Sequence, residues 1–124
     1  MKRQIRIRAG SVTALAELYN TRTAEAIWHT LPLSSNVHTW GEEIYFTIPL
    51  KAGLEDGREV VNCGDLAYWP PGNAFCIFFG ATPVSGEGEI RAASPVNIFG
   101  SLVGDPKVLA KVKDGEKIIV EKTS

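Results

Sequence analysis

The chain has 124 residues, of which 44% are hydrophobic and 22% charged, and its formal net charge at pH 7 is −1. These values predict one globular domain over residues 1–124 and argue against intrinsic disorder. The chain has no excess of basic residues of the kind found in nucleic-acid-binding proteins. Its longest apolar run, Ala74–Phe79, is far shorter than the ~20 residues of a membrane span. No apolar segment follows the basic N-terminus, so we expect no secretory signal, a cytoplasmic location, and neither nucleic acid nor membrane as a partner.

A β-hairpin and a helix are the first elements that the sequence predicts. Gln4–Arg8 alternates polar and apolar residues, Ala9–Ser11 is typical of a tight turn, and Val12–Leu18 is a second strand. Four apolar residues then recur at the spacing of one helix face: Ala24, Ile27, Trp28 and Leu31. They predict a helix that ends at Pro32.

The rest of the chain predicts a polar connector, a series of short strands and a second short helix. The connector is Leu33–Val37, and the helix begins at Asp105 and runs to Lys113. The predicted strands are Glu42–Pro49, Glu59–Asn62, Leu66–Trp69, Ala74–Phe79, Val96–Val103 and Lys117–Lys122. About eight strands without regular strand–helix alternation predict a mainly-β fold, a small barrel or a sandwich.

The chain shows no pattern of a metal site or of a known catalytic motif. Cys63 and Cys76 fit neither a Cys-x-x-Cys pair nor a zinc array, and we expect two buried apolar thiols, with a disulfide or a reactive thiol as alternatives. Gly64–Phe75 resembles the second motif of cupin barrels, but Phe75 stands where a metal-binding cupin has histidine, and His38 has no histidine partner. We therefore predict no metal, no cofactor and no catalytic residue.

Adjacent carboxylates and a group of aromatic residues are the remaining candidates for a site. Glu42 and Glu43 start a predicted strand and should point to opposite faces, so they cannot act as a carboxylate pair. Two solvated charges are the favoured interpretation, and the alternative is that one of them lines a pocket. Most of the aromatic residues should be core, and a subset should line an apolar ligand pocket. These residues are Tyr45, Phe46, Tyr68, Trp69, Phe75, Phe78 and Phe79.

Several stretches of the sequence resemble the cyclophilin fold. Arg22–Trp28 is similar to the Lys-Thr-Ala-Glu-Asn-Phe start of the first cyclophilin helix, Asn62–Leu66 to its Gln-Gly-Gly-Asp-Phe stretch, and Val96–Gly100 to its Val-Val-Phe-Gly strand. Two longer strings, Thr39–Phe46 and Gly64–Gly72, resemble uncharacterised cyclophilin-like proteins of bacteria and archaea. The resemblance runs from end to end and implies a small closed cyclophilin-like β-barrel of about eight strands with two short helices.

Cyclophilins are peptidyl-prolyl isomerases, and the resemblance implies where their catalytic pocket would fall. The strand that should carry the catalytic arginine matches Ile44–Pro49, which contains no arginine. The pocket glutamine matches Asn62, the pocket phenylalanine matches Phe75, and the pocket tryptophan and histidine fall near Arg91 and Val96. The candidate ligand-binding residues are therefore Phe46, Arg58, Asn62, Phe75 and Arg91.

Four functional hypotheses follow, and the sequence leaves open whether the protein is an enzyme. The favoured one is a barrel that binds a small molecule or peptide in an aromatic pocket without prolyl isomerase turnover. The first alternative is a divergent isomerase in which Arg58 or Arg91 replaces the missing arginine. The others are a different enzyme, including a metal-dependent cupin type, and a structural or interaction role.

Overall fold

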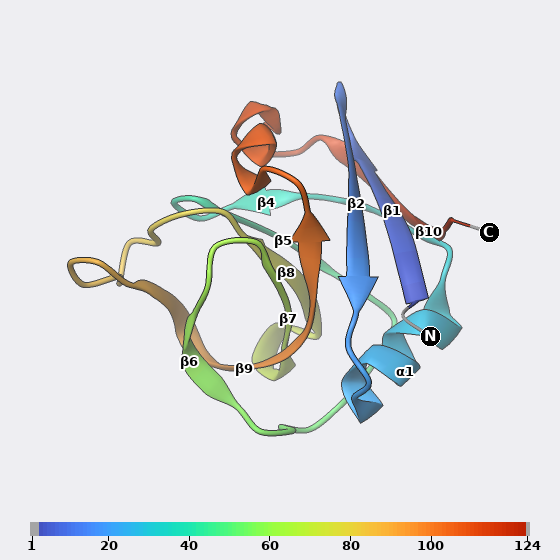
Figure 1. Cartoon of the computed structure of the whole chain (residues 1–124), viewed down its shortest axis with the longest axis horizontal. Helices are drawn as coiled ribbons and strands as arrows, with labels where there is room; N and C mark the ends of the chain where they lie inside the picture. Colours follow the sequence, from blue (N-terminus) through green and yellow to red (C-terminus); the bar gives the residue numbers. More distant parts are fainter. Residues whose placement is uncertain (1–2, 124) are drawn as a thin grey trace.

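Ten strands make up the fold of residues 3–123, the part of the chain that the computed structural model describes (Figure 1). The strands are β1 (Arg3–Ala9), β2 (Val12–Leu18), β3 (Leu33–Asn36), β4 (His38–Thr39), β5 (Glu43–Thr47), β6 (Arg58–Val61), β7 (Asp65–Trp69), β8 (Ala74–Phe78), β9 (Ile90–Val103) and β10 (Lys117–Lys122). The helical segments are α1 (Arg22–Thr30) and the 3-10 helices η1 (Pro70–Gly72) and η2 (Pro106–Lys111). The predicted mainly-β fold is confirmed.

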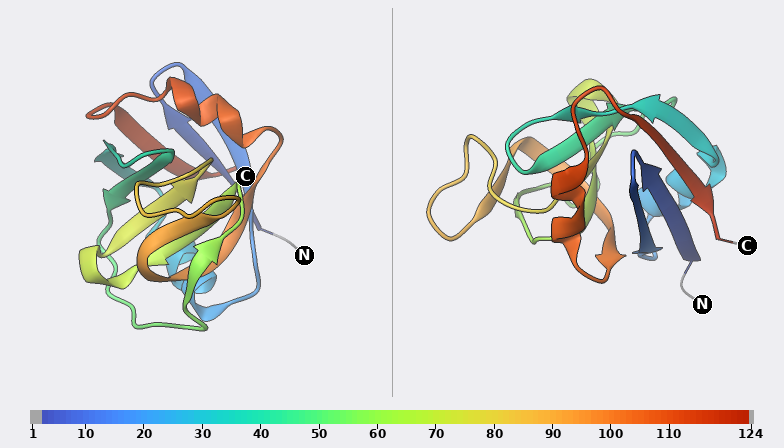
Figure 2. Two further views of the ribbon diagram at one scale, coloured as in Figure 1. Left: turned by 90° about the vertical axis from the view of Figure 1, so that its left-hand side faces the viewer. Right: turned by 90° about the horizontal axis from the view of Figure 1, so that it is seen from above.

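The strands form one curled antiparallel sheet whose two edges are neighbours in the chain (Figure 2). Its order is β3-β10-β1-β2-β9-β7-β8-β5-β4, and β6 pairs with β9 outside this path. Only Val37 separates the edge strands β3 and β4 in sequence, and its backbone bonds to the turn before β10, with 2.9 Å from Val37 N to Glu116 O and 2.8 Å from Gly115 N to Val37 O. Among residues 3–123 no ladder of hydrogen bonds joins β3 to β4, so the prediction of a closed barrel is not confirmed.

The main core lies inside the curled sheet and is covered at both ends. Alternation in β1 places Ile5 and Ile7 inside, fully or almost fully buried. In Figure 1 and in the left-hand view of Figure 2, α1 and η2 lie at opposite ends of the sheet. Ile27 of α1 and Leu109 of η2 have no exposed surface and join the same apolar cluster. The amphipathic spacing that predicts these segments therefore serves to close the two ends of the core.

A second, smaller core lies on the outer face of β7 and β8. Every residue of β8 is buried, because one face points into the main core and the other is covered by β6 and the first half of β9. Because the first half of β9 forms this cover, the strand begins at Ile90, six residues earlier than the predicted start at Val96. The second core contains Val61, Ala67, Ala74, Cys76, Phe78, Ala92 and Val96.

The strands that the sequence missed are the two edge strands. Leu33–Asn36, predicted as part of a connector, is β3, and His38–Thr39 is β4. Their residues are mostly polar and exposed, so they carry no hydrophobic alternation that could indicate a strand. Backbone pairing with β10 and β5 holds them in the sheet.

Gly100 provides a test of the pairing between β2 and β9. It lies opposite Leu18, and a Cβ atom there would be 2.5 Å from the Glu17 carbonyl oxygen. We expect Gly100→Ala to lower the free energy of unfolding by about 1–3 kcal/mol, measured by urea denaturation, because the strands must move apart. Gly53→Ala is the matched control, since its Cβ would meet nothing within 4 Å and should change stability by less than about 0.5 kcal/mol. Equal unfolding curves for Gly100→Ala and the wild type would contradict this close approach.

Candidate functional site

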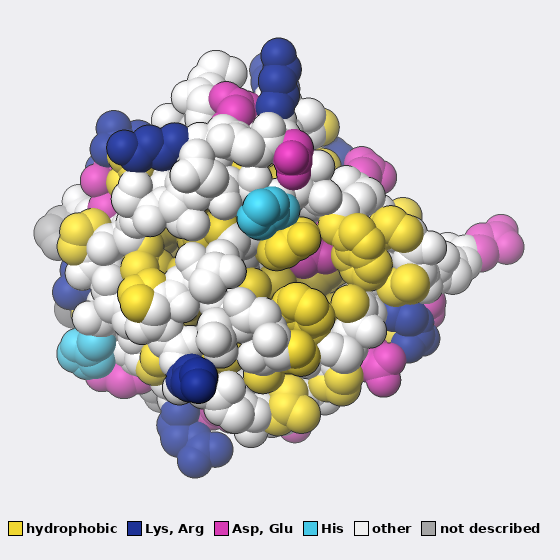
Figure 3. All heavy atoms as spheres, turned by 180° about the vertical axis from the view of Figure 1, so that it is seen from behind, with side chains coloured by type: hydrophobic (Ala, Val, Ile, Leu, Met, Phe, Trp, Pro, Cys, Tyr) yellow, Lys and Arg dark blue, Asp and Glu magenta, His cyan; other side chains and the backbone are white. Residues whose placement is uncertain are grey.

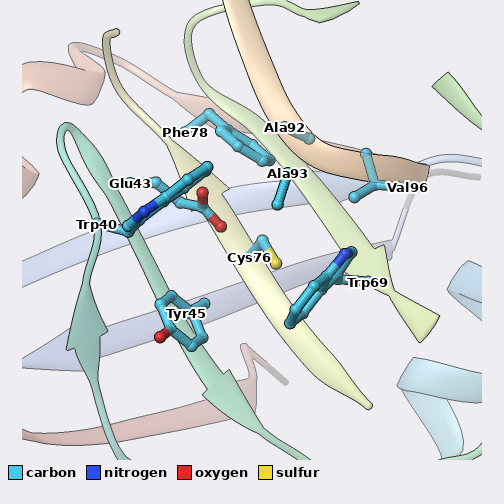
Figure 4. A pocket seen from close by; sticks show the side chains of 9 residues that line it. All are labelled: Trp40, Glu43, Tyr45, Trp69, Cys76, Phe78, Ala92, Ala93 and Val96. Carbon is cyan, nitrogen blue, oxygen red and sulfur yellow. The ribbon is translucent and has the colours of Figure 1, made fainter. Parts of the chain in front are cut away.

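A pocket of about 260 Å³ opens beside the second core, on the outer face of the sheet (Figure 4). Strands β5, β7, β8 and β9 and the residue that follows β4 supply its walls. The lining residues are Trp40, Glu43, Tyr45, Trp69, Cys76, Phe78, Ala92, Ala93 and Val96. On the face seen in Figure 3, hydrophobic side chains gather around a hollow in which an acidic side chain is visible. The pocket is thus an apolar recess with one acid in its wall.

The two-residue period of β5 and β8 places the polar and aromatic residues in the pocket. Tyr45 pairs with Cys76, and these two side chains face outward into the pocket. The intervening pair, Ile44 opposite Ile77, faces inward and has no exposed surface. Glu43 lies two residues before Tyr45, so the same alternation turns its carboxyl into the pocket.

Aromatic side chains from three separate segments stand around the recess. The indole nitrogen of Trp69 donates a 2.7 Å hydrogen bond to the hydroxyl of Ser94, which holds that ring against β9. The Tyr45 ring lies 5.3 Å from the His38 ring, measured between centroids. Trp40 is placed by a tight turn between β4 and β5, in which Gly41 has a φ of 60° and a Cβ would lie 2.8 Å from the Ala81 carbonyl oxygen. This turn therefore requires glycine.

Glu43 is a buried acid without an ion-pair partner among residues 3–123. Glu43 is only 5% exposed. This burial raises the pKa of its carboxyl to about 7, and a hydrogen bond from the Cys76 thiol lowers the pKa by a smaller amount. Burial, with the neighbouring Glu43 charge, also raises the pKa of Cys76, so this thiol stays protonated and is a donor rather than a nucleophile. Near neutral pH the Glu43 carboxyl can therefore either donate or accept a proton.

The adjacent Glu42 behaves as an ordinary surface charge. It points away from the pocket, and the ammonium group of Lys107 lies 3.4 Å from its carboxylate. The prediction that the two carboxylates point to opposite faces is confirmed. The favoured interpretation of two solvated charges is wrong for Glu43, because the outer face of β5 is covered by apolar side chains at that position.

The five residues predicted to bind a ligand lie in three different surroundings, and none lines this pocket. Phe46 and Phe75 have no exposed surface and stack inside the main core with ring centroids 4.9 Å apart, so a surface ligand does not reach them. Arg58 and Asn62 do come together, in a separate groove of about 390 Å³. The Arg91 guanidinium lies 2.8 Å from the Glu89 carboxylate, with Glu59 also in contact.

The subset of aromatic residues that lines the pocket is Tyr45, Trp69 and Phe78. Sequence reasoning missed Trp40 and Cys76 as pocket residues, and it gave Glu43 only as the less favoured alternative that one of the two carboxylates lines a pocket. The alternation that puts Tyr45 on the outer face of β5 also puts Glu43 there. No periodicity could place Trp40, since it lies in the turn between two strands.

The described residues offer no cluster of three or more potential ligands for a metal ion. Both cysteines are free, and the expectation that both are buried is wrong for Cys63, which is exposed in the turn before β7. None of the helices in residues 3–123 has the length and apolar character needed to cross a membrane.

Comparison with known proteins agrees with this architecture. The family model described as Cyclophilin-like matches residues 3–121. The chain belongs to this family. The solution structure of the hypothetical protein AF2241 from Archaeoglobus fulgidus is similar, with a TM-score of 0.83 and 41% sequence identity over 98% of this chain and 95% of that one. No curated protein matches the chain. The resemblance to an uncharacterised cyclophilin-like family is thereby confirmed.

The raised pKa of Glu43 predicts a particular dependence of stability on pH. Between its ordinary pKa of 4.5 and its folded value of about 7, the native state binds more protons than the unfolded state, so the contribution of Glu43 to stability falls as pH rises through this window. Glu43→Gln removes this penalty. We expect the unfolding free energy of Glu43→Gln, relative to wild type, to increase by on the order of 3 kcal/mol from about pH 4 to about pH 8.

Urea denaturation at a series of pH values measures this difference. Glu42→Gln is the control, because its carboxyl is exposed and its relative stability should change little over the same range. A Glu43→Gln curve that stays parallel to wild type at every pH would contradict the burial of an acid at this position.

Proposed function

We propose that this protein binds a small organic molecule in the outer-face pocket and does not catalyse prolyl isomerisation. The observation that supports this most strongly is the recess itself, in which three aromatic side chains surround one buried acid. Ligand sites are typically apolar concavities in which a few polar groups fix the orientation of the ligand. These three residues are Trp40, Tyr45 and Trp69, and the Phe78 ring also lines the recess.

The size of the pocket supports a small ligand. Its volume of about 260 Å³ lies just below the ~300–1,000 Å³ that is usual for drug-sized molecules. One compact group fits a recess of this size, whereas an extended peptide needs a longer groove. The residues that wall it come from β5, β7, β8 and β9, which are mutually hydrogen-bonded, so the recess is largely preformed.

The charges around the pocket support binding without isomerisation. Twisting an amide in a cyclophilin relies on an arginine at the prolyl carbonyl, as the resemblance implies, and neither Lys nor Arg is among the residues lining this pocket. Arg91, one possible replacement, is held by Glu89 and Glu59. Arg58, the other, lies in the separate groove with Asn62.

Two probes test this proposal on the same labelled protein. The neutral alcohol 3,3-dimethyl-1-butanol should shift the methyl NMR signals of Ala92, Ala93 and Val96, because its compact apolar head fits the recess. Ala93→Phe should abolish the shifts at Ala92 and Val96 by filling the pocket from an exposed position. Ala110→Phe is the control, since Ala110 is also exposed and does not line the pocket.

The second probe is a short Ala-Pro peptide, observed by exchange spectroscopy. We expect catalytic amounts of the protein to leave its cis–trans exchange unchanged. If the wild type accelerated the exchange and Arg58→Ala or Arg91→Ala removed this acceleration, the protein would instead be a divergent isomerase. Absence of methyl shifts with the alcohol and with its cationic isostere choline alike would contradict the pocket as a ligand site.

A further inference from the structure

The Glu43 carboxyl lacks a compensating positive charge. A buried carboxylate is ordinarily paired with a basic group or satisfied by several hydrogen bonds, because burial without a partner is costly. Glu43 makes no ion pair within residues 3–123. The one hydrogen-bonding group there that lowers its pKa is the weak thiol donor of Cys76, which also lies 3.9 Å from the Ala74 carbonyl oxygen. Ligand binding can supply the missing partner.

Charged groups on the neighbouring elements do not supply it. The His38 ring of β4 packs against the Tyr45 ring, and Lys107 of η2 forms an ion pair with Glu42. On β9, the Arg91 guanidinium is held by Glu89. None of these three basic side chains lines the recess.

The aromatic walls fit a positive charge as well. Trp40 and Tyr45 stand on one side of the Glu43 carboxyl and Trp69 on another, each projecting from a different segment (Figure 4). Aromatic rings attract a cation that lies within about 6 Å of the ring centre, and Trp does so most strongly. An anion, in contrast, would be repelled both by the carboxylate and by the ring faces.

The lining also distinguishes between kinds of ammonium group. A primary ammonium carries three N–H donors that all need acceptors once it is buried. Glu43 is the sole carboxylate in the lining, and the remaining side chains are aromatic or aliphatic apart from the Cys76 thiol. A methylated ammonium has few or no donors and presents a hydrocarbon surface, so it matches walls of this composition.

Building on the proposed function, we propose that the ligand is a small organic cation with a methylated ammonium head, held among Trp40, Tyr45 and Trp69 with Glu43 as its counter-ion. The head fits the volume of the recess, and the carboxylate supplies the charge that the rings alone lack. Binding has a consequence for protonation. A cation beside Glu43 favours the ionised form, so a proton leaves the carboxyl when the ligand binds below about pH 7.

The experiment compares choline with its neutral carbon isostere, 3,3-dimethyl-1-butanol, by NMR titration of the whole chain. At about pH 8 we expect choline to bind at least about tenfold more tightly than the alcohol. Between about pH 6 and pH 8 the affinity for choline should rise by up to about tenfold, whereas that for the alcohol should stay constant or fall slightly.

Three variants locate the source of the preference. Glu43→Gln keeps the shape of the side chain but not its charge, and should bring the two affinities within about twofold of each other and remove the rise with pH. Trp40→Leu keeps an apolar wall and should weaken choline more than the alcohol. Glu42→Gln alters a charge outside the pocket and should keep the preference at least about fivefold, since an exposed charge is screened.

Three results would overturn the inference, and they differ in what they say about the pocket. Equal binding of choline and the alcohol, with methyl shifts at Ala92 and Val96, would leave a ligand pocket that has no preference for cations. Absence of binding by both probes would reject the proposed function together with the inference. A preference for choline that survives in Glu43→Gln would reject Glu43 as the counter-ion.

Discussion

Strands β5 and β8 are joined by an antiparallel ladder in which Phe46 lies opposite Phe75 and Tyr45 lies opposite Cys76. The first pair stacks inside the main core, and the second faces the outer pocket. Because side chains alternate along a strand, this one register decides which residues form the core and which form the recess. If β5 slipped by one residue against β8, Glu43 would enter the main core and Phe46 would turn to the outer face. Both changes would cost folding free energy, and this cost fixes the register.

The outer pocket exists because the cover on this face of the sheet is incomplete. The first half of β9 and its partner β6 close over Ala67 and Cys76 and form the second core. The cover does not extend across β5, so Tyr45 remains partly exposed at the edge of the recess. Glu43 lies at this boundary, where it is shielded from water and has no protein cation beside it. Its raised pKa and the shape of the pocket thus have a common origin in how far β9 reaches.

The loop between β5 and β6 is held by a different set of interactions, in which polar groups are paired with one another. The Tyr68 hydroxyl donates to the Leu50 carbonyl at 2.6 Å, and the Asn97 side-chain oxygen accepts from the Glu55 amide at 2.7 Å. Glu55 in turn accepts hydrogen bonds from Thr23 at the start of α1, which lower its pKa to about 2. The polar groups in this network have strong hydrogen-bond partners, whereas Glu43 has only the weak thiol donor of Cys76.

Sequence reasoning predicted most of the fold and only part of the site. The hairpin of β1 and β2 and the helix α1 have strong periodicity, and local pattern decides them. Sheet curvature instead depends on contacts between distant segments, so neither the edge strand β3 nor the early start of β9 could be read from local pattern. The resemblance to cyclophilins pointed to Phe46 and Phe75 as pocket residues, but both are core residues in this chain. The aromatic character of the pocket was predictable, but the burial of Glu43 depends on how far β9 folds over the outer face of β8 beside it.

The most direct test of this account is the titration of the Glu43 side-chain carboxyl carbon, followed by ¹³C NMR with and without tetramethylammonium. The account predicts a pKa near 7 in the free protein, and a clearly lower pKa when the cation is bound. A carboxyl that titrates near 4.5 and does not respond to the cation would contradict it, because Glu43 would then be a solvated acid with no role in binding.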